Sequence, residues 1–326
     1  MNPSGGRPPP AVELPPGGGL LLVDKPSGCT SHDVVGRVRA VLGTRKVGHA
    51  GTLDPMATGL LVLGVERSTK LLGHLALTDK SYEATIRLGE FTTTDDAEGT
   101  VTSSADASAI RREAIVAGMR ALTGDLMQVP SSVSAIKVDG RRSYQRMRAG
   151  QSVELAARPV TIRRFELMRD VRRQGGLADL DVIVDCSSGT YVRALARDLG
   201  AALGVGGHLI ALRRSRVGPF DVAGAVDVYG SSGVPDRGAP RSPIADALAS
   251  AVGAAIMPPA AVARQVFEVR VATEAEALDL RFGRALDAAG IAGTYAVLDP
   301  TGTRLLALVA EADGSARPRL VFEAVG

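Results

Sequence analysis

The feature that most constrains the fold is a stretch near residue 50 that is interrupted by glycines. Residues 46–64 read KVGHAGTLDPMATGLLVLG. Gly48, Gly51 and Gly59 break any single regular element, and Pro55 biases Asp54 toward an extended or turn conformation. The pattern predicts that Asp54 lies on a loop, followed at residues 60–65 by a short buried strand or helix segment.

Two interpretations of Asp54 follow from this stretch alone. An aspartate that precedes a proline is commonly just a turn former. The same loop, however, concentrates Lys46, His49 and a carboxylate, and loops on rigid scaffolds are where reactive groups are usually placed.

Length and composition indicate a globular protein with more than one domain. A chain of 326 residues exceeds the usual single-domain size, and its 45% hydrophobic and 22% charged residues are ordinary values. No run approaches the roughly 20 apolar residues of a membrane span, and the start lacks signal-peptide features, so we expect a cytoplasmic protein with no membrane contact. Cys29 and Cys186 have no CxxC spacing or nearby His cluster, which argues against a disulfide framework or a metal site.

Several segments have clear local patterns. The first 19 residues hold six prolines and five glycines, which predicts a disordered tail. Residues 20–26 predict a strand, and Ser31 is positioned to cap a helix that Gly43 ends. Residues 80–89 alternate like a strand, with Tyr82 on the apolar face.

The later segments continue the alternation of helices and strands. Residues 111–122 predict a helix whose apolar face includes Ala114 and Met119. Residues 182–193 predict a strand, a turn and the start of a helix. After residue 257, Thr273 is positioned to cap a short helix between strands, which predicts a small, mostly β unit.

Four separated motifs resemble those of one family. Residues 48–59, GHAGTLDPMATG, resemble the catalytic motif of the bacterial tRNA pseudouridine-55 synthase family, the TruB type, whose aspartate is the nucleophile. Residues 24–32 resemble its first motif, 127–144 its RNA-clamping segment, and 182–193 a third motif, and the likeness continues through 208–220. The resemblance implies an α+β fold with a mixed, mainly antiparallel sheet.

The resemblance also implies a division of the chain. We expect a tail at 1–19, a pseudouridine synthase catalytic domain at 20–257 with an RNA-clamping insertion at about 128–155, and a PUA-like C-terminal domain at 258–326. The last of these rests on position, because its sequence match is weak.

Site residues are carried over motif by motif. Asp54 would be the catalytic nucleophile, Arg193 the arginine that pairs with it, and Tyr82 the aromatic residue that stacks on the target base. Tyr191 and Leu212 would line the same pocket. Taken without the resemblance, a tyrosine on the apolar face of a strand is most often core filling.

Three further positions remain open. His49, five residues before Asp54, is expected to contact RNA, although an isolated histidine is more often structural. Lys25 either supports the active site or is a plain surface lysine. Thr93 departs from the family pattern, which usually has an aspartate there.

The implied reaction needs neither redox chemistry nor energy input, so we expect no cofactor. A carboxylate serves as covalent catalyst if it stays ionised, and a nearby guanidinium is expected to lower its pKa and orient it. The expected partner is the T-arm of tRNA, with a monomeric enzyme and no guide RNA. Alternatives are a guide-RNA-dependent synthase subunit and a tRNA-binding protein that has lost catalysis.

The positive charge of the chain is concentrated in one segment. Between Lys137 and Arg173 there are eleven basic and four acidic residues, a balance of +7 in a chain of net charge +3, so the remainder carries −4. Such a run is either a solvated face or a surface for a polyanion. The resemblance favours RNA-backbone contacts by Lys137, Arg141, Arg142 and Arg146.

Replacing Arg141, Arg142 and Arg146 by Ala should weaken tRNA binding and flatten its salt dependence. Phosphate contacts release counterions, whereas the chemistry at the base does not depend on them. The slope of log affinity against log salt, measured with the saturated rate as control, checks this. An unchanged slope would mean that these arginines are only a solvated face.

Overall fold

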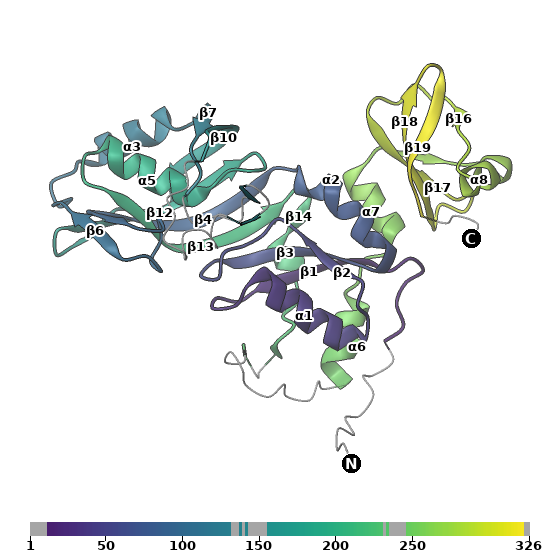
Figure 1. Cartoon of the computed structure of the whole chain (residues 1–326), viewed down its shortest axis with the longest axis horizontal. Helices are drawn as coiled ribbons and strands as arrows, with labels where there is room; N and C mark the ends of the chain where they lie inside the picture. The colour runs from purple at the N-terminus through teal and green to yellow at the C-terminus, as the bar shows by residue number, and fades with distance from the viewer. Residues whose placement is uncertain are drawn as a thin grey trace, which may run out of the picture.

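The protein is organised around one large sheet. The computed structural model describes residues 12–131, 137–138, 141–142, 155–230, 233–234 and 246–322. Within them, the large sheet has ten strands and extends through the left and centre of Figure 1. Its main strands are, in spatial order, β1 (Gly19–Lys25), β3 (Thr58–Val65), β13 (Gly207–Val217), β4 (Lys80–Leu88), β12 (Leu177–Cys186), β10 (Arg158–Leu167) and β7 (Gly124–Gln128).

Three shorter strands complete the sheet: β2 (Val47–Ala50) beside β3, β11 (Arg172–Gln174) beside β12, and β14 (Phe220–Asp221) beside β13. Every pairing in it is antiparallel except that of β3 with β13. The expected mixed, mainly antiparallel sheet is therefore confirmed. The remaining short elements are η1 (Glu66–Leu71), α2 (Leu72–Ala76), β5 (Glu90–Thr92), β6 (Val101–Ser104) and η2 (Val222–Gly224).

The centre of the sheet buries one face under two helices. Helices α3 (Arg112–Ala121) and α5 (Val192–Ala202) pack with β4, β10 and β12, as Figure 1 shows at the left. The alternation expected for β4 is confirmed, because Tyr82 and every second residue after it is buried. In α3 the expected face was wrong by one residue, since Ile115 is buried with Met119 while Ala114 is exposed.

Strands β1 and β3 are buried on both faces, which explains their uninterrupted apolar sequences. Leu21 and Leu61 face helices α1 (Ser31–Leu42) and α6 (Asp246–Ala254), whereas Leu20 and Leu60 face the opposite cluster. The segment at 60–65, for which strand and helix were both open, is therefore a strand.

The ends of α1 show how local chemistry sets a helix. Thr30, and not Ser31 as expected, is the N-cap: its hydroxyl accepts from the Asp33 amide while the Asp33 carboxylate accepts from the Thr30 amide. At the other end Gly43 adopts a φ of +66°, the left-handed conformation that terminates helices.

The N-terminal segment is better packed than its composition suggests. Residues 1–11 of the expected tail lie outside the described part of the chain. Val12 and Leu14, however, pack against the α1–α6 cluster, and Gly19 already belongs to β1. The tail expected at 1–19 is therefore wrong for its last residues.

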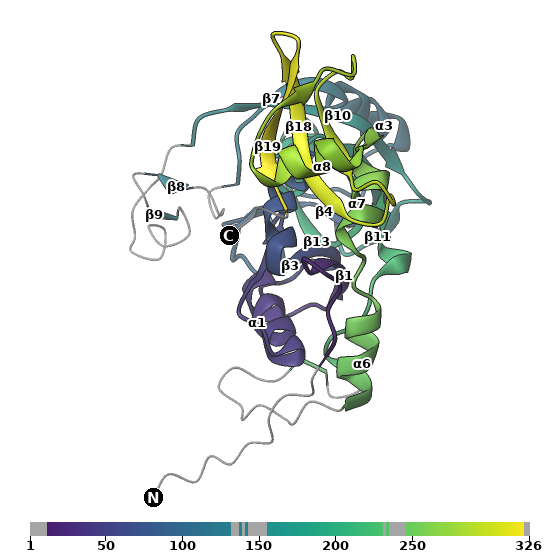
Figure 2. The ribbon, with the colours of Figure 1, turned by 90° about the vertical axis from the view of Figure 1, so that its right-hand side faces the viewer.

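The C-terminal unit is a five-stranded sheet with one helix, seen at the upper right of Figure 1 and in front in Figure 2. Thr273 caps its helix with a reciprocal bond to Glu276, as expected. Its elements are β15 (Val269–Val271), α8 (Glu274–Arg281), β16 (Leu286–Asp287), β17 (Thr294–Leu298), β18 (Leu305–Ala312) and β19 (Ser315–Val321).

The boundary expected at residues 257 and 258 does not separate two independent cores. Helix α7 (Pro259–Val266) contacts β1 as well as β17 and β18, and residues of all four elements belong to one apolar cluster. The five-stranded sheet begins at Val269, eleven residues after the expected first residue of the C-terminal domain, 258.

Only part of the expected insertion at 128–155 is described. It contains a hairpin of β8 (Lys137–Val138) and β9 (Arg141–Arg142), drawn to one side in Figure 2. Arg146 lies outside the described residues. No helix in the described part of the chain has the length and apolarity to cross a bilayer.

Gly59 should tolerate no side chain. A Cβ there would lie 2.3 Å from the Arg214 carbonyl oxygen, and the φ of +98° disfavours other residues. Gly59→Ala should lower the free energy of unfolding by more than about 1 kcal/mol, as measured by urea denaturation.

Gly36→Ala is the matched control, because its added Cβ on α1 meets nothing within 4 Å. It should stabilise the protein by about 0.5–1 kcal/mol. Equal unfolding midpoints for the two variants would contradict the steric argument.

Candidate active site

Asp54 lies on the loop that joins β2 to β3, as predicted. The buried Lys25 side chain holds this loop through hydrogen bonds to its backbone. The Lys25 ammonium donates to the carbonyl oxygens of Pro26 at 2.9 Å, Pro55 at 3.2 Å and Ala57 at 2.7 Å. Lys25 is fully buried, and this burial lowers its pKa. The alternative of a plain surface lysine was therefore wrong.

Two more buried side chains fasten the same loop. The Ser31 hydroxyl accepts from the Leu53 amide at 2.9 Å and lies 3.1 Å from the Leu53 carbonyl. Arg214 donates to the carbonyls of Leu60 at 2.7 Å and Gly51 at 3.0 Å. The loop is thus held on both sides of Asp54, and the sequence alone did not single out Ser31 or Arg214 for this role.

One guanidinium organises the charges of the site. Arg193 contacts both oxygens of Asp54, with Nε 3.0 Å from Oδ2 and a terminal nitrogen 3.2 Å from Oδ1. Its other terminal nitrogen contacts Asp96 at 3.1 Å and the Thr94 carbonyl at 2.9 Å. The side chains of Arg193 and Asp96 are only 4% and 3% exposed, whereas that of Asp54 is 36% exposed.

Sequence reasoning missed Asp96 and considered Thr93 instead. The Thr93 hydroxyl accepts from the Thr100 amide, which closes the loop between β5 and β6. The carboxylate of this loop that reaches Arg193 comes three residues later. The sequence did contain one signal for Asp96: it is an acidic residue close to Thr93, where the family usually has an aspartate.

An apolar wall adjoins the Asp54 loop. Tyr82 on β4 and Leu212 on the neighbouring β13 are each 7% exposed and share one cluster with Leu53 and Ala57. Burial raises the pKa of the Tyr82 hydroxyl, with Arg214 opposing this, so the ring stays neutral. Tyr191, the N-cap residue of α5, is half-buried two residues before Arg193.

Family models match most of the chain. The N-terminal domain model described as TruB family pseudouridylate synthase matches residues 39–192, and two models of the C-terminal part match 193–229 and 267–323. The chain belongs to the TruB family. The recognition made from the motifs is confirmed.

Curated relatives extend over nearly the whole chain. A tRNA pseudouridine synthase B of Nocardia farcinica is 55% identical over 324 residues, which cover 99% of each chain. The protein of that name from an Arthrobacter species is 52% identical and covers 93% of this chain and 96% of its own.

Among solved structures, the archaeal box H/ACA sRNP Nop10-Cbf5 complex has a chain with a TM-score of 0.66 at 23% identity, covering 99% of this chain and 93% of its own. A chain of an H/ACA RNP bound to a substrate RNA gives 0.64 at 21%, with 98% and 92% covered. These likenesses confirm the fold of this TruB-family protein.

The other predicted residues in the described part of the chain belong to strands β2, β8 and β9. His49 is half-buried in strand β2, opposite Leu63, and not in the loop itself. The backbones of Lys137, Arg141 and Arg142 form the β8–β9 hairpin.

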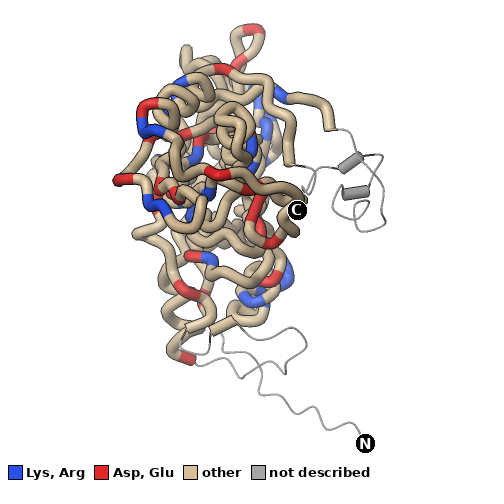
Figure 3. The backbone as a smooth tube through the Cα atoms, turned by 90° about the vertical axis from the view of Figure 1, so that its left-hand side faces the viewer, with Lys and Arg blue, Asp and Glu red and all other residues tan. Residues whose placement is uncertain are grey.

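In the described C-terminal part of the basic segment, residues 155–173, several arginines pair with acidic side chains. Arg163 pairs with Asp79 at 2.7 Å and Arg164 with Glu166 at 2.8 Å. Figure 3 likewise shows acidic and basic residues interspersed along the described backbone. The prediction of RNA-backbone contacts therefore rests on residues 137–148.

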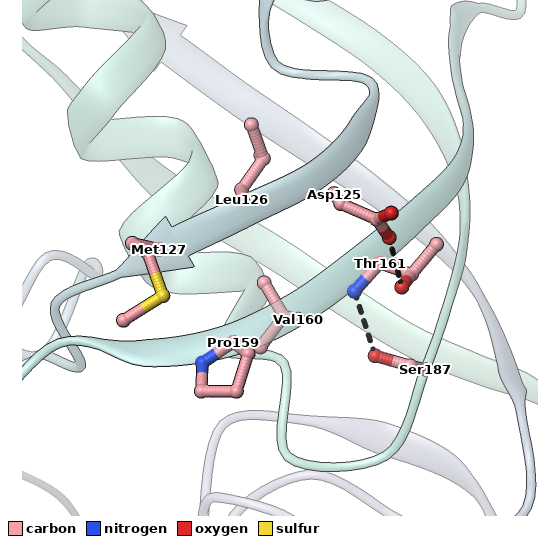
Figure 4. A pocket seen from close by; sticks show the side chains of 7 residues that line it. All are labelled: Asp125, Leu126, Met127, Pro159, Val160, Thr161 and Ser187. Carbon is pink, nitrogen blue, oxygen red and sulfur yellow. Dashed lines mark hydrogen bonds between the residues drawn. The ribbon is translucent and has the colours of Figure 1, made fainter.

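A separate hollow of about 270 Å³ lies where β7 and β10 meet the turn after β12 (Figure 4). Thr161 donates from its hydroxyl to Asp125 at 2.6 Å and from its amide to Ser187 at 2.9 Å. The hollow is lined by Asp125, Leu126, Met127, Pro159, Val160, Thr161 and Ser187, none of which belongs to the predicted site.

The described residues contain no group of three or more His, Cys, Asp or Glu side chains that could hold a metal ion.

The ionisation of Asp54 is set by opposing influences. Burial raises the pKa of its carboxyl, Arg193 lowers it, and the neighbouring Asp96 raises it again. Arg193 thus lowers the pKa as expected, but burial outweighs this effect, and the resulting pKa lies above the usual value. Because Asp96 shares the guanidinium, Arg193 compensates only part of the cost of ionising Asp54.

This balance predicts the acid limb of the pH profile. If ionised Asp54 is required, activity falls as the pH drops through its raised pKa, above the range of an exposed aspartate. Arg193→Gln removes the main opposing charge and should move the limb to still higher pH, measured as kcat/KM against pH.

Arg270→Gln, which breaks the pair with Glu276 in the C-terminal unit, should leave the limb in place. A limb that stays in place in Arg193→Gln as well would show that the observed pKa does not belong to Asp54.

Proposed function

We propose that this TruB-family enzyme isomerises uridine 55 in the TΨC loop of tRNA to pseudouridine, with Asp54 as the covalent catalyst. The observation that carries the proposal is the two-point contact of Arg193 with Asp54, on a loop fastened by buried side chains. The relatives described above, all tRNA pseudouridine synthases B by name, support tRNA as the substrate.

The reaction breaks the C1′–N1 bond of uridine and forms a C1′–C5 bond, while a proton leaves C5 and N1 gains one. No oxidant, reductant or cofactor enters this balance. Ionised Asp54 supplies the electron pair of the covalent intermediate, and Arg193 keeps its carboxylate oriented. The partial exposure of Asp54 allows substrate to reach it.

The placement of Asp96 excludes this residue as the second carboxylate that a hydrolase would need, and a product test addresses the exposed Glu98 of the same loop. A glycosidase needs two carboxylates that reach the sugar from opposite sides. Asp96 is buried on the far side of the Arg193 guanidinium and is occupied by it, so it cannot serve as that second carboxylate. Chromatography should accordingly detect no free uracil among the products.

The remaining predicted residues hold the substrate. The target base leaves the folded RNA loop, and the Tyr82 ring offers it an aromatic face, with Leu212 and Tyr191 lining the pocket. His49 contacts RNA near the loop. Lys137, Arg141, Arg142 and Arg146 contact the RNA backbone.

We further propose that the enzyme acts alone, as a cytoplasmic monomer on the T-arm of tRNA. The solved structures similar to it come from guide-RNA particles, but at 21–23% identity they bear on the fold alone. Modification of a bare tRNA transcript without guide RNA supports the proposal, and a requirement for guide RNA would refute it.

Asp54→Asn should abolish turnover while leaving folding and tRNA affinity nearly intact. The amide preserves the shape of the side chain but cannot act as an anionic nucleophile. Tritium release from C5-labelled uridine in tRNA measures turnover, and filter binding measures affinity.

The matched control is Asp106→Asn, an exposed aspartate outside the site, which should release tritium at the wild-type rate. Parallel loss of affinity and activity in Asp54→Asn would instead indicate a structural role. A wild-type protein that binds tRNA and releases no tritium would be a pure binding protein.

A further inference from the structure

A second arginine lies one helical turn behind the catalytic pair. Arg197 follows Arg193 by four residues on α5, so the two emerge on the same side of the helix. Its guanidinium contacts Asp95 at 3.2 Å, Asp198 at 2.9 Å and the Val129 carbonyl at 2.8 Å. It thereby joins α5 to the 93–99 loop and to the end of β7.

Asp95 occupies an unusual backbone conformation. Its φ of +58° lies in the left-handed region, which costs free energy for a residue with a side chain. The Leu209 amide of β13 donates to its carbonyl at 3.1 Å, and Arg197 holds its carboxylate. Because Asp96 is the next residue, the conformation of Asp95 determines where the Asp96 carboxylate points.

The segment at 128–131 is attached to α5 at two points. The Gln128 amide group donates to the Tyr191 carbonyl at 3.1 Å and accepts from the Tyr191 amide at 2.9 Å. Val129 accepts from Arg197. Arg193 lies between these two attachments along the helix.

We propose that Arg197 is a positioning residue that holds Asp95 in its left-handed turn and so aims Asp96 at Arg193, which orients Asp54. The Arg197 side chain also holds the 128–131 segment against α5 through the Val129 carbonyl. The inference rests on the function proposed above and adds a residue that touches neither Asp54 nor the open face of the site.

The competing explanation is an ordinary stabilising ion pair. Partly exposed pairs contribute little to stability, and the side chains of Arg197 and Asp95 are 24% and 13% exposed. A pair that only stabilises would change the melting temperature but not the rate of folded enzyme. A positioning pair changes the chemical step.

The test is single-turnover tritium release at saturating tRNA with Arg197→Gln and Arg197→Lys. Small misplacements of catalytic groups cost up to about a hundredfold in rate, so the Gln variant should lose roughly tenfold or more. Its affinity for tRNA should stay within about twofold of wild type, whereas a binding role would weaken it more. Lys keeps the charge but cannot make the three contacts, and should recover part of the rate.

The pH profile provides a second readout. Asp54 faces Arg193 on α5, Asp96 and Glu98 in the 93–99 loop, and Lys25 at the end of β1. If Arg197→Gln loosens the hold of Arg193 on Asp54, the acid limb should move to higher pH. A purely structural loss would lower the amplitude of the profile without moving it.

A double-mutant cycle locates the effect. Asp95→Asn removes the charge but tolerates the left-handed conformation, so the turn is retained. If both residues act through one pair, the double variant should be no slower than Arg197→Gln alone. Fully additive losses would overturn the proposed route through Asp95.

Arg87→Gln is the matched control, because Arg87 and Asp179 form a two-point pair of similar burial. Arg87→Gln should keep the wild-type rate, and a loss equal to that of Arg197→Gln would overturn the inference.

A wild-type rate and pH profile in Arg197→Gln would also overturn the inference. If that variant does not fold, Arg197→Lys and Asp95→Asn carry the test. Absence of tritium release from the wild type would refute the proposed function instead.

Discussion

The structure of the site depends on the Arg193 guanidinium, which is shared by two carboxylates. A buried arginine needs a compensating charge, and Asp96 supplies it from a position closed to solvent. With Asp54 as the second partner, the three groups carry one net negative charge when all are ionised. Because Asp54 is the only one of the three that is partly exposed, that charge lies on the solvent side of the site.

Two buried cations hold the Asp54 loop through main-chain carbonyls. Lys25 donates to the carbonyls of Pro55 and Ala57 after Asp54, and Arg214 donates to those of Gly51 before it and Leu60 after it. Several charge-assisted hydrogen bonds offset the loss of hydration when such groups are buried. The backbone of the segment that contains Gly51 and Gly59 is thereby fixed on both sides of Asp54.

The pairing of β1 with β3 brings Lys25 next to the Asp54 loop. Strands β1 and β3 are buried on both faces, so the Lys25 end of β1 and the loop before β3 lie on a rigid base. Helix α7 continues one of these apolar clusters into the C-terminal unit. The two parts of the protein therefore share a core at their junction, although each has its own sheet.

Elements that depend on neighbouring residues could be predicted from the sequence. Residues a few positions apart are enough to predict the alternation in β4, the glycine after α1, the cap at Thr273 and the loop around Asp54. The resemblance to family motifs added the site residues Asp54, Tyr82 and Arg193. The contacts of Asp96 and Arg197 and the raised pKa of Asp54 could be found only in the folded protein. Arg193 is 97 residues from Asp96 and 139 from Asp54, and Arg214 is 163 from Gly51. Such pairings, and the burial that sets a pKa, arise only when distant segments pack, and no local pattern in the chain records them.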